Sequence, residues 1–493
     1  MLAAGGPLIS TLLRRTALVF LAVCQTLAYY FYLPLGMGPH VILEPWLLRQ
    51  GWSLYRELPD HHTPLMPLLM SLAQRFSGEE LRAGKLVLVA LLLLTLLLVY
   101  RLTARIASEN AALWAALFFV CWSPVFQSGQ LRFEAFLTPL YLLAWDTWLP
   151  AENGRRGPRD FLAGFILGIA FLVKQHAAVT LVLFLGWQVF TLLRQHQPTA
   201  LVLRTGLAAL AGFCGPVLIA LVIYLAAGGS LGQLLFWTVT FNNGDLARLL
   251  ALAPTPADLQ ALLPPLLLVP AYLAIAGRQI RTEQAGWGRH GMPLTLLLSG
   301  ILLALPRYGS EHLQPALPGL AMGSGLVLEQ LRTSMGRELA WRQALVGTLL
   351  AFWLLFPLAG VIQASPPGAA RTIHEYSLLP PLAEQVRQQI GPDECPYLMP
   401  EDEANSNLHF FLGCQPPGRL WLFSAYPWFS RFDLPEQALN ALQTAAPRWV
   451  LYFPERWRVE EHNPRLMAYV TAHYDQKATF LFESGTVWLM EKR

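Results

Sequence analysis

The sequence predicts a polytopic α-helical membrane protein that ends in a small α/β domain. Only 13% of the 493 residues are charged and 54% are apolar, whereas soluble proteins carry about a quarter charged residues. Apolar runs that can cross a bilayer, such as 86–99, 207–227 and 345–361, recur up to residue 365. Residues 366–493 have the mixed composition of a soluble domain. A soluble enzyme, a DNA-binding protein and a disordered chain are therefore excluded.

The apolar runs predict a transmembrane domain over residues 1–365 with about eleven helices. Two connections, 35–83 and 228–259, are long. Amphipathic stretches at 46–54 and 64–76 in the first connection predict helices that lie on the membrane surface. The predicted span centres fall near residues 25, 93, 117, 140, 167, 185, 215, 268, 300, 321 and 353.

Basic residues are divided unequally between the two sides of this topology. The N-terminus and every second loop carry 15 Arg, whereas the longer alternate connections carry nine Lys or Arg. Because positively charged loops stay in the cytoplasm, we expect a cytoplasmic N-terminus. An odd number of spans then places residues 366–493 outside. The expected location is the inner (plasma) membrane, with a periplasmic or otherwise extracytoplasmic C-terminal domain.

The C-terminal segment 366–493 alternates strand and helix patterns. Its 11 basic and 15 acidic residues, against 24 and 16 before it, argue against nucleic acid as a partner. Cys395 and Cys414 either form a disulfide, if the domain faces an oxidising compartment, or remain free thiols. Strands are expected at 396–399, 448–453 and 487–490, and helices at 379–390, 435–445 and 465–474.

Ionisable side chains gather on the outer side of the predicted topology. Near membrane depth such residues are costly and by default indicate function. Lys174 interrupts the apolar run 161–193, which is long enough for two short spans. The other members are Glu44 and the cluster 57–64 in the first outer loop, Arg132 and Glu134, and Arg307, Glu311 and His312.

Each of these residues also has a plainer interpretation. Glu44 can be a solvated loop acid, Arg132 can pair with Glu134, and Lys174 can extend its ammonium group to the interface. Taken together, however, carboxylates and several cations around a membrane cavity suit a lipid phosphate substrate. Cations bind a phosphate and stabilise it as a leaving group, and a carboxylate takes the proton from an attacking hydroxyl.

Three stretches follow one another in an order found in a known family. They are Glu44-Pro45-Trp46 with Leu54-Tyr55-Arg56-Glu57 and His62-x-Pro64; Gly164-x-x-x-Gly168 continuing to Lys174; and Pro306-Arg307-Tyr308. In this order they resemble the GT-C membrane glycosyltransferases. The similarity is to the family 39-like set, which includes protein O-mannosyltransferases and the lipid A aminoarabinose transferase.

The resemblance implies a GT-C-like fold and an inverting hexosyl or pentosyl transferase. The donor is a sugar on polyprenyl phosphate, and the acceptor is a lipid, glycan or protein of the cell envelope, as in lipopolysaccharide or glycan biosynthesis. Glu44 matches the general base, where the family usually has Asp, and Glu57 and Asp60 are reserve candidates. No cofactor or metal is expected. Phosphate binding falls to Arg132, Lys174, Arg307 and His312, and positioning of the loop or acceptor to Tyr55, Arg56, His61, His62 and Glu134.

Two other functions compete with a transferase. A transporter or flippase of lipid-linked sugars would use the same cations for binding only. Many transporters are built from repeats, and we find no repeat between the halves of this sequence. The second alternative is a non-catalytic subunit of envelope assembly that retains the fold without the chemistry.

Overall fold

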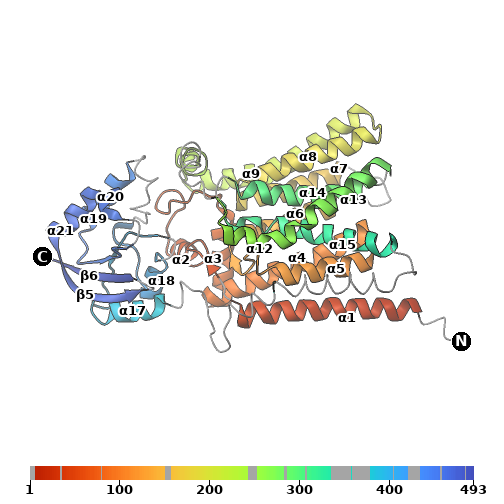
Figure 1. Ribbon diagram of the computed structural model, residues 1–493. Coiled ribbons are helices and arrows are strands. Elements are labelled where there is room, and N and C mark those ends of the chain that lie inside the picture. The colour runs from red at the N-terminus through yellow and green to blue at the C-terminus, as the bar shows by residue number, and fades with distance from the viewer. Residues whose placement is uncertain are drawn as a thin grey trace. The chain divides into compact units, whose positions relative to one another are not determined.

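The computed structural model divides the chain into two compact units (Figure 1). The helical unit contains 1–33, 85–226 and 250–370, and the mixed unit contains 34–84, 227–249 and 371–493. The residues described below are 6–33, 36–78, 80–149, 157–242, 253–282, 286–305, 308–334, 357, 378–402, 405–419, 433–455, 458–482 and 485–493.

The helical unit is a bundle of long helices that run side by side (Figure 1). α7 packs against α6 and α9, α5 packs against α15, and α14 packs against α8 and α15. The helices are α1 (Gly6–Leu27), α4 (Glu80–Ile106), α5 (Glu109–Trp122), α6 (Phe133–Trp148), α7 (Gly157–Val173), α8 (Ala177–Arg194), α9 (Thr199–Ala226), α12 (Pro256–Leu266), α13 (Leu268–Thr282), α14 (Gly286–Leu303) and α15 (Ala316–Ser334).

These helices bear out the polytopic membrane fold. Ten of the eleven predicted span centres lie inside them, and the eleventh, residue 353, lies outside the described residues. Within the described residues, five segments are long and apolar enough to cross a bilayer: Leu12–Tyr32, Glu80–Ile106, Ala177–Arg194, Thr199–Ala226 and Asp258–Arg281. α5 and the His290–Leu303 part of α14 are apolar but shorter.

Basic residues of the predicted cytoplasmic loops meet acidic residues at one end of the bundle. Arg14 near the start of α1 bonds Glu109 at the start of α5. Arg105 at the end of α4 lies 2.6 Å from the Asp146 carboxylate near the end of α6. The chain directions assumed for these first helices are therefore consistent with their packing.

The apolar run 161–193 forms two helices, as predicted. α7 ends at Val173 and α8 begins at Ala177, so Lys174 lies in the turn between them. The Lys174 amide still donates to the Ala170 carbonyl, 3.0 Å away, and its carbonyl accepts from the Ala177 amide at 3.0 Å. The backbone polar groups at this break are thus satisfied while the chain reverses.

Glycines allow α7 and α9 to approach backbone to backbone. A Cβ atom at Gly164 would lie 1.9 Å from the Ala209 carbonyl oxygen, and one at Gly212 would lie 2.0 Å from the Phe161 carbonyl oxygen. Small residues at helix contacts permit this close packing in membranes. The Gly164-x-x-x-Gly168 pattern therefore has a structural role in the bundle.

The mixed unit contains the first long connection and the C-terminal segment. α2 (Leu43–Arg49) and α3 (Leu65–Ser77) come from the connection. α3 leaves Leu68, Leu72 and Phe76 exposed along one side. The remaining helices of this unit are α10 (Leu231–Leu235), η2 (Phe236–Thr240), α17 (Leu379–Arg387), α18 (Leu408–Leu412), α19 (Leu434–Ala445), α20 (Val459–His462) and α21 (Pro464–His473).

A four-stranded sheet forms the C-terminal part of the mixed unit, in the order β3-β4-β6-β5. β3 (Tyr397–Met399) pairs in parallel with β4 (Trp449–Tyr452), while β6 (Gly485–Lys492) runs antiparallel to both β4 and β5 (Tyr474–Phe482). Side chains of β3, β4 and β6 pack with α19 and α21 in one apolar core.

Each helix and strand expected in residues 366–493 has a counterpart, whereas β5 and the short helices α18, η4 (Pro417–Arg419) and α20 were not predicted. The three expected strands correspond to β3, β4 and β6, and the three expected helices to α17, α19 and α21. β5 was not predicted, because its first half contains the three consecutive polar residues Asp475, Gln476 and Lys477. They interrupt the alternation of apolar and polar side chains that indicates a strand. Cys395 and Cys414 form a disulfide, with a Cα–Cα distance of 5.7 Å.

Gly212→Val should destabilise the bundle, because the new side chain would meet the backbone of α7 and force the helices apart. Overpacking of this kind costs about 1–3 kcal/mol, and we expect a lower melting temperature of the protein in detergent. Gly206→Val on the same helix is the matched control, because nothing lies within 4 Å of the added Cβ. Equal melting temperatures for both variants would contradict the close packing.

Candidate active site

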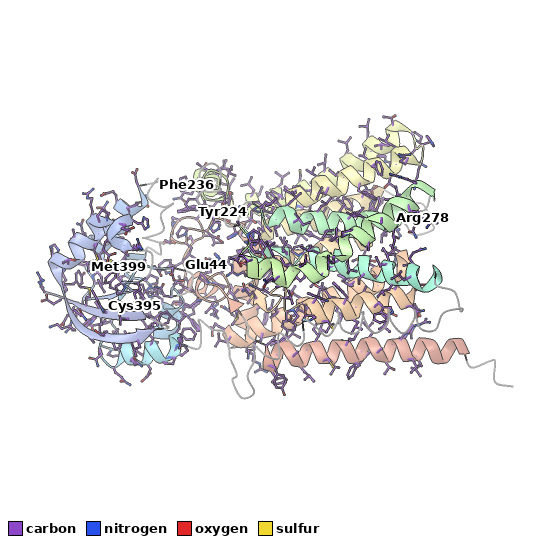
Figure 2. All side chains as sticks on the ribbon, viewed as in Figure 1. Glu44, Tyr224, Phe236, Arg278, Cys395 and Met399 are labelled. Atoms are coloured by element: carbon purple, nitrogen blue, oxygen red, sulfur yellow. A yellow bond between two sulfur atoms is a disulfide. The ribbon has the colours of Figure 1, made fainter. Side chains whose placement is uncertain are left out.

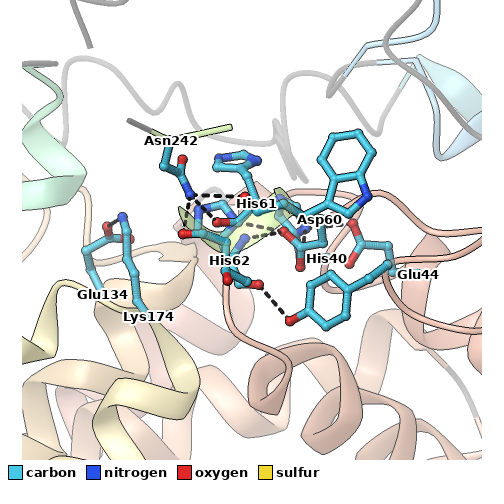
Figure 3. A network of polar contacts seen from close by, with 11 residues as sticks. His40, Glu44, Asp60, His61, His62, Glu134, Lys174 and Asn242 are labelled. Atoms are coloured by element: carbon cyan, nitrogen blue, oxygen red, sulfur yellow. Dashed lines mark hydrogen bonds and ion pairs between the residues drawn. The ribbon is translucent and has the colours of Figure 1, made fainter. Parts of the chain in front are cut away.

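The described residues predicted as site members belong to two groups of ionisable side chains, one in each unit. The carboxylate–histidine group of the mixed unit contains His40, Glu44, Asp60, His61 and His62. The glutamate–lysine group of the helical unit contains Arg132, Glu134, Lys174, Glu311 and His312. Figure 3 shows residues of both groups.

Glu44 lies in the first turn of α2 and its side chain is fully buried. A tight turn precedes the helix, in which the Glu44 amide donates to the Pro39 carbonyl at 2.9 Å. This turn brings His40 Nδ1 within 2.7 Å of Glu44 Oε1 (Figure 3). At this distance the two groups form an ion pair when the His40 ring is protonated.

Asp60 is also buried and is held by the residue two positions later. Its Oδ1 accepts from the His62 backbone amide at 2.8 Å and lies 2.9 Å from His62 Nδ1. Its Oδ2 lies 4.0 Å from His40 Nδ1. His40 therefore stands between the Glu44 and Asp60 carboxylates.

Two further contacts shape the loop around these side chains. Tyr55 has a positive φ of 66°, and its hydroxyl donates to the His62 carbonyl at 2.9 Å. Asn242 Nδ2 donates to the His61 carbonyl at 2.6 Å. The rings of His61 and His62 lie 3.9 Å apart between their centroids. The role of Tyr55 in positioning the loop or acceptor stays a prediction, with which this hydrogen bond is compatible.

Glu57 and Arg56 lie on the turn that leads to Asp60. The Glu57 carboxylate accepts from the Ser53 amide at 2.8 Å and from Arg56 at 3.2 Å. The Arg56 side chain is 61% exposed. These contacts give Glu57 a local role in stabilising the turn and rank it below Glu44 as a candidate base.

The glutamate–lysine group is centred on the buried Glu134 carboxylate. Lys174 Nζ bonds Glu134 Oε1, and His312 Nδ1 lies 2.7 Å from the same oxygen. Glu134 comes from the start of α6, Lys174 from the turn after α7, and His312 from η3 (Ser310–Leu313). The sequence prediction that these residues gather at one end of the spans is thus met within this unit.

The pairing within this group differs from the plainer interpretation of Arg132. Arg132 Nη1 lies 3.4 Å from Glu311 Oε1, while Glu134 is engaged by Lys174 and His312. Two of the expected phosphate ligands, Lys174 and His312, therefore share one carboxylate. Arg307, the remaining expected ligand, lies outside the described residues.

His40, Asp60 and His62 could also hold a metal ion. One ligand atom from each lies within 4.8 Å of the others, and imidazole and carboxylate are common ligands of divalent metals. The sequence expectation that no metal is needed is not tested by this arrangement.

Sequence reasoning missed His40 and Asn242 as members of these groups. The spacing of His40 four positions before Glu44 is a usable signal, because such a pair meets when the chain turns helically. Asn242 carried no comparable signal, since it reaches its partner only through the tertiary fold. Glu311 is among the ionisable residues that the sequence indicates, but its pairing with Arg132 depends on the tertiary fold. Asn242 lies 181 positions from His61, and Glu311 lies 179 positions from Arg132.

Lys174→Met should destabilise the helical unit, because it leaves the buried Glu134 carboxylate with one cationic partner fewer. Removing one member of a buried ion pair costs about 3–5 kcal/mol. The double variant with Glu134→Gln, which removes the charge, should recover most of the lost melting temperature. If Lys174→Met alone melts at the same temperature as the native protein, the ion pair does not contribute to the stability of the helical unit.

Comparison with known protein families supports the resemblance to the GT-C membrane glycosyltransferases. Residues 61–227 match the family model described as dolichyl-phosphate-mannose-protein mannosyltransferase. This segment includes His62-x-Pro64 and the stretch from Gly164 to Lys174, and it ends well before the C-terminal domain. A search of curated protein sequences finds no match.

Solved structures match over nearly the whole chain. ArnT from Cupriavidus metallidurans bound to undecaprenyl phosphate is 14% identical, with a TM-score of 0.63 over 99% of this chain and 98% of that one. The same protein in the apo state is 12% identical, with a TM-score of 0.61 over 97% and 98%. The archaeal oligosaccharyltransferase AglB from Archaeoglobus fulgidus, in complex with an inhibitory peptide and a dolichol-phosphate, is 12% identical. Its TM-score is 0.53, and the match covers 98% of this chain and 75% of that one.

These similarities extend beyond the membrane bundle. The match to ArnT covers the connections and the C-terminal segment as well as the helices. The chain is a polytopic membrane protein with the fold of the GT-C membrane glycosyltransferases, and the resemblance inferred from its motifs is confirmed.

Proposed function

We propose that the protein is an inverting glycosyltransferase that moves a hexosyl or pentosyl group from a polyprenyl-phosphate donor to a cell-envelope acceptor. The observation that carries the proposal is the buried Glu44 carboxylate, held 2.7 Å from His40 Nδ1 in the first long connection. A GT-C fold and similarity to proteins solved with undecaprenyl phosphate or dolichol-phosphate support the donor class.

In this proposal Glu44 acts as the general base. It takes the proton from the acceptor hydroxyl as that oxygen attacks the anomeric carbon of the sugar. The bond between this carbon and the phosphate oxygen breaks, the configuration inverts, and the lipid phosphate leaves with the electron pair. His40 orients the Glu44 carboxylate for proton transfer.

Stabilisation of the leaving phosphate is assigned to the cations of the helical unit. Arg132 is 35% exposed at its side chain and is bound to Glu311 at 3.4 Å, a contact that a phosphate can replace. Lys174 and His312 both engage Glu134. Glu134 would hold these two cations in place and lower the net positive charge that a phosphate meets.

The contacts of the three candidate acids rank them. Asp60 already accepts two bonds from His62 on one oxygen, and Glu57 binds the Ser53 amide. These contacts stabilise the conformation of the loop. Glu44 matches the position of the family's general base and, like Asp60, has a histidine as its partner, so it is the first choice for the base.

The proposed reaction takes place on the extracytoplasmic side of the inner membrane. The excess of Arg in the N-terminus and alternate loops supports this orientation. The Arg14–Glu109 and Arg105–Asp146 contacts at one end of the bundle agree with it. The acceptor is a lipid, glycan or protein exposed on that side.

Glu44→Gln should abolish the release of free polyprenyl phosphate, because glutamine is close in size but takes no proton. The measurement uses the purified protein in liposomes with radiolabelled polyprenyl-phosphate sugars and an envelope extract as acceptor. We expect a loss of about 10²-fold or more, the range of general-base catalysis. Glu57→Gln is the matched control and should retain turnover.

Other results of the same assay would point elsewhere. Equal release by the native protein and Glu44→Gln would move the base to Asp60 or Glu57. If no donor releases polyprenyl phosphate while label still crosses the bilayer, the transferase proposal fails and a flippase remains. A native chain with neither activity would favour the non-catalytic assembly subunit.

Turnover should persist after treatment with EDTA and removal of the chelator. The reason is that Asp60 Oδ1 is already bound by two donors from His62, so the carboxylate does not depend on a cation. Release of polyprenyl phosphate would be compared before and after treatment, and after addition of Mg²⁺, Mn²⁺ or Zn²⁺. Loss of turnover that a metal restores would contradict this, and would place the ion at His40, Asp60 and His62.

A further inference from the structure

A second group of potential metal ligands lies in the C-terminal part of the mixed unit. It consists of Cys395 and Cys414, joined by the disulfide, and His409 on α18 (Figure 2 labels Cys395). His409 Nδ1 lies 3.4 Å from Cys395 Sγ. One atom from each of the three residues lies within 4.8 Å of the others.

The environment of His409 determines which of its nitrogens faces the sulfur atoms. The side chain is buried, and Nε2 lies 3.2 Å from Glu401 Oε1. A carboxylate favours the tautomer that carries its proton on Nε2. In that tautomer Nδ1 presents a lone pair to the sulfur atoms, as ligation of a metal by this nitrogen requires.

We propose that Cys395, His409 and Cys414 bind a zinc ion when the disulfide is reduced. Two thiolates and one imidazole are typical zinc ligands. A carboxylate on the far nitrogen of a ligating histidine is the usual supporting contact in zinc sites, because it fixes the tautomer and orients the ring. Glu401 supplies that contact to His409. Water or another small ligand completes the fourth position.

The change from disulfide to zinc site balances with a dithiol as the reductant. The dithiol transfers two electrons and two protons, so the S–S bond breaks to give two thiols and the dithiol becomes a disulfide. Zinc then binds, and the two thiols lose their protons to become thiolate ligands. The sulfur atoms move apart to about 3.8 Å, as tetrahedral coordination with Zn–S bonds of about 2.3 Å requires.

The site lies next to contacts that join this segment to the first long connection within the mixed unit. The Leu43 amide donates to Asn407 Oδ1 at 3.2 Å, and Trp52 Nε1 donates to Gln415 Oε1 at 3.0 Å. The ring of Trp46 lies 6.1 Å from that of Phe410. Either covalent or zinc closure between Cys395 and Cys414 holds the segment that makes these contacts.

The test uses the full-length protein in detergent, with Cys24, Cys121 and Cys214 replaced by Ala so that no other thiol binds metal. The disulfide is reduced with a phosphine, which becomes its oxide, and the reductant is removed. Zinc content is then measured after dialysis, and Co²⁺ is added separately to look for thiolate-to-metal charge-transfer absorption. The reduced protein should bind one zinc per chain more than the oxidised protein.

Three variants locate the ligands. Cys395→Ser should abolish the Co²⁺ charge-transfer spectrum of a two-thiolate site, and His409→Gln should weaken zinc binding at least tenfold. Glu401→Gln should weaken it by about 10–100-fold, the usual effect of losing a supporting carboxylate. His473→Gln, which changes an exposed histidine on α21, is the matched control and should bind zinc like the parent protein.

Two results would overturn the proposal. One is a reduced protein that binds no more zinc than the oxidised protein. The other is a His409→Gln variant that binds zinc as tightly as the parent while its oxidised form melts normally. The measured quantities are metal content and absorption, which do not depend on transferase activity. A failure of the proposed function would leave them unchanged.

Discussion

A buried carboxylate needs a proton donor or a cation within reach, and this requirement organises both units. Leaving such a charge without partners in a low-dielectric interior costs several kcal/mol. In the helical unit the requirement is met by ending α7 at Val173, so that Lys174 turns inward to Glu134. η3 then brings His312 to the same oxygen from a distant part of the chain. The α7–α8 turn and η3 thus each place a basic side chain against Glu134.

The same requirement acts in the mixed unit, with histidines in place of lysine. His40 stands between the Glu44 and Asp60 carboxylates, and His62 binds Asp60 through both its backbone and its ring. Histidine can give up its proton near neutral pH, whereas lysine keeps it. The carboxylates of the first connection are therefore paired with groups that can follow a proton transfer, which suits acid–base chemistry better than permanent ion pairing does.

The organisation of the chain also differs from its linear order. The sequence interpretation assigns the first long connection to the membrane domain, yet residues 34–84 and 227–249 group with 371–493 in the mixed unit. The Leu43–Asn407 contact illustrates how, since its partners are 364 positions apart. Glu44 is the next residue after Leu43, so the candidate base is carried on a helix that is held by the C-terminal segment.

The sequence by itself determined the class of protein and the positions of most elements. Apolar length decides whether a helix can span a bilayer, and this property is local to each segment. The break at Lys174, the candidate residue Glu44 and the short strands β3, β4 and β6 were accessible for the same reason. The partners of the charged residues were not, because a carboxylate is satisfied by whichever donor the fold brings to it. The tertiary structure alone decided that Glu134 takes Lys174 and His312, that Arg132 takes Glu311, and that His409 faces the disulfide.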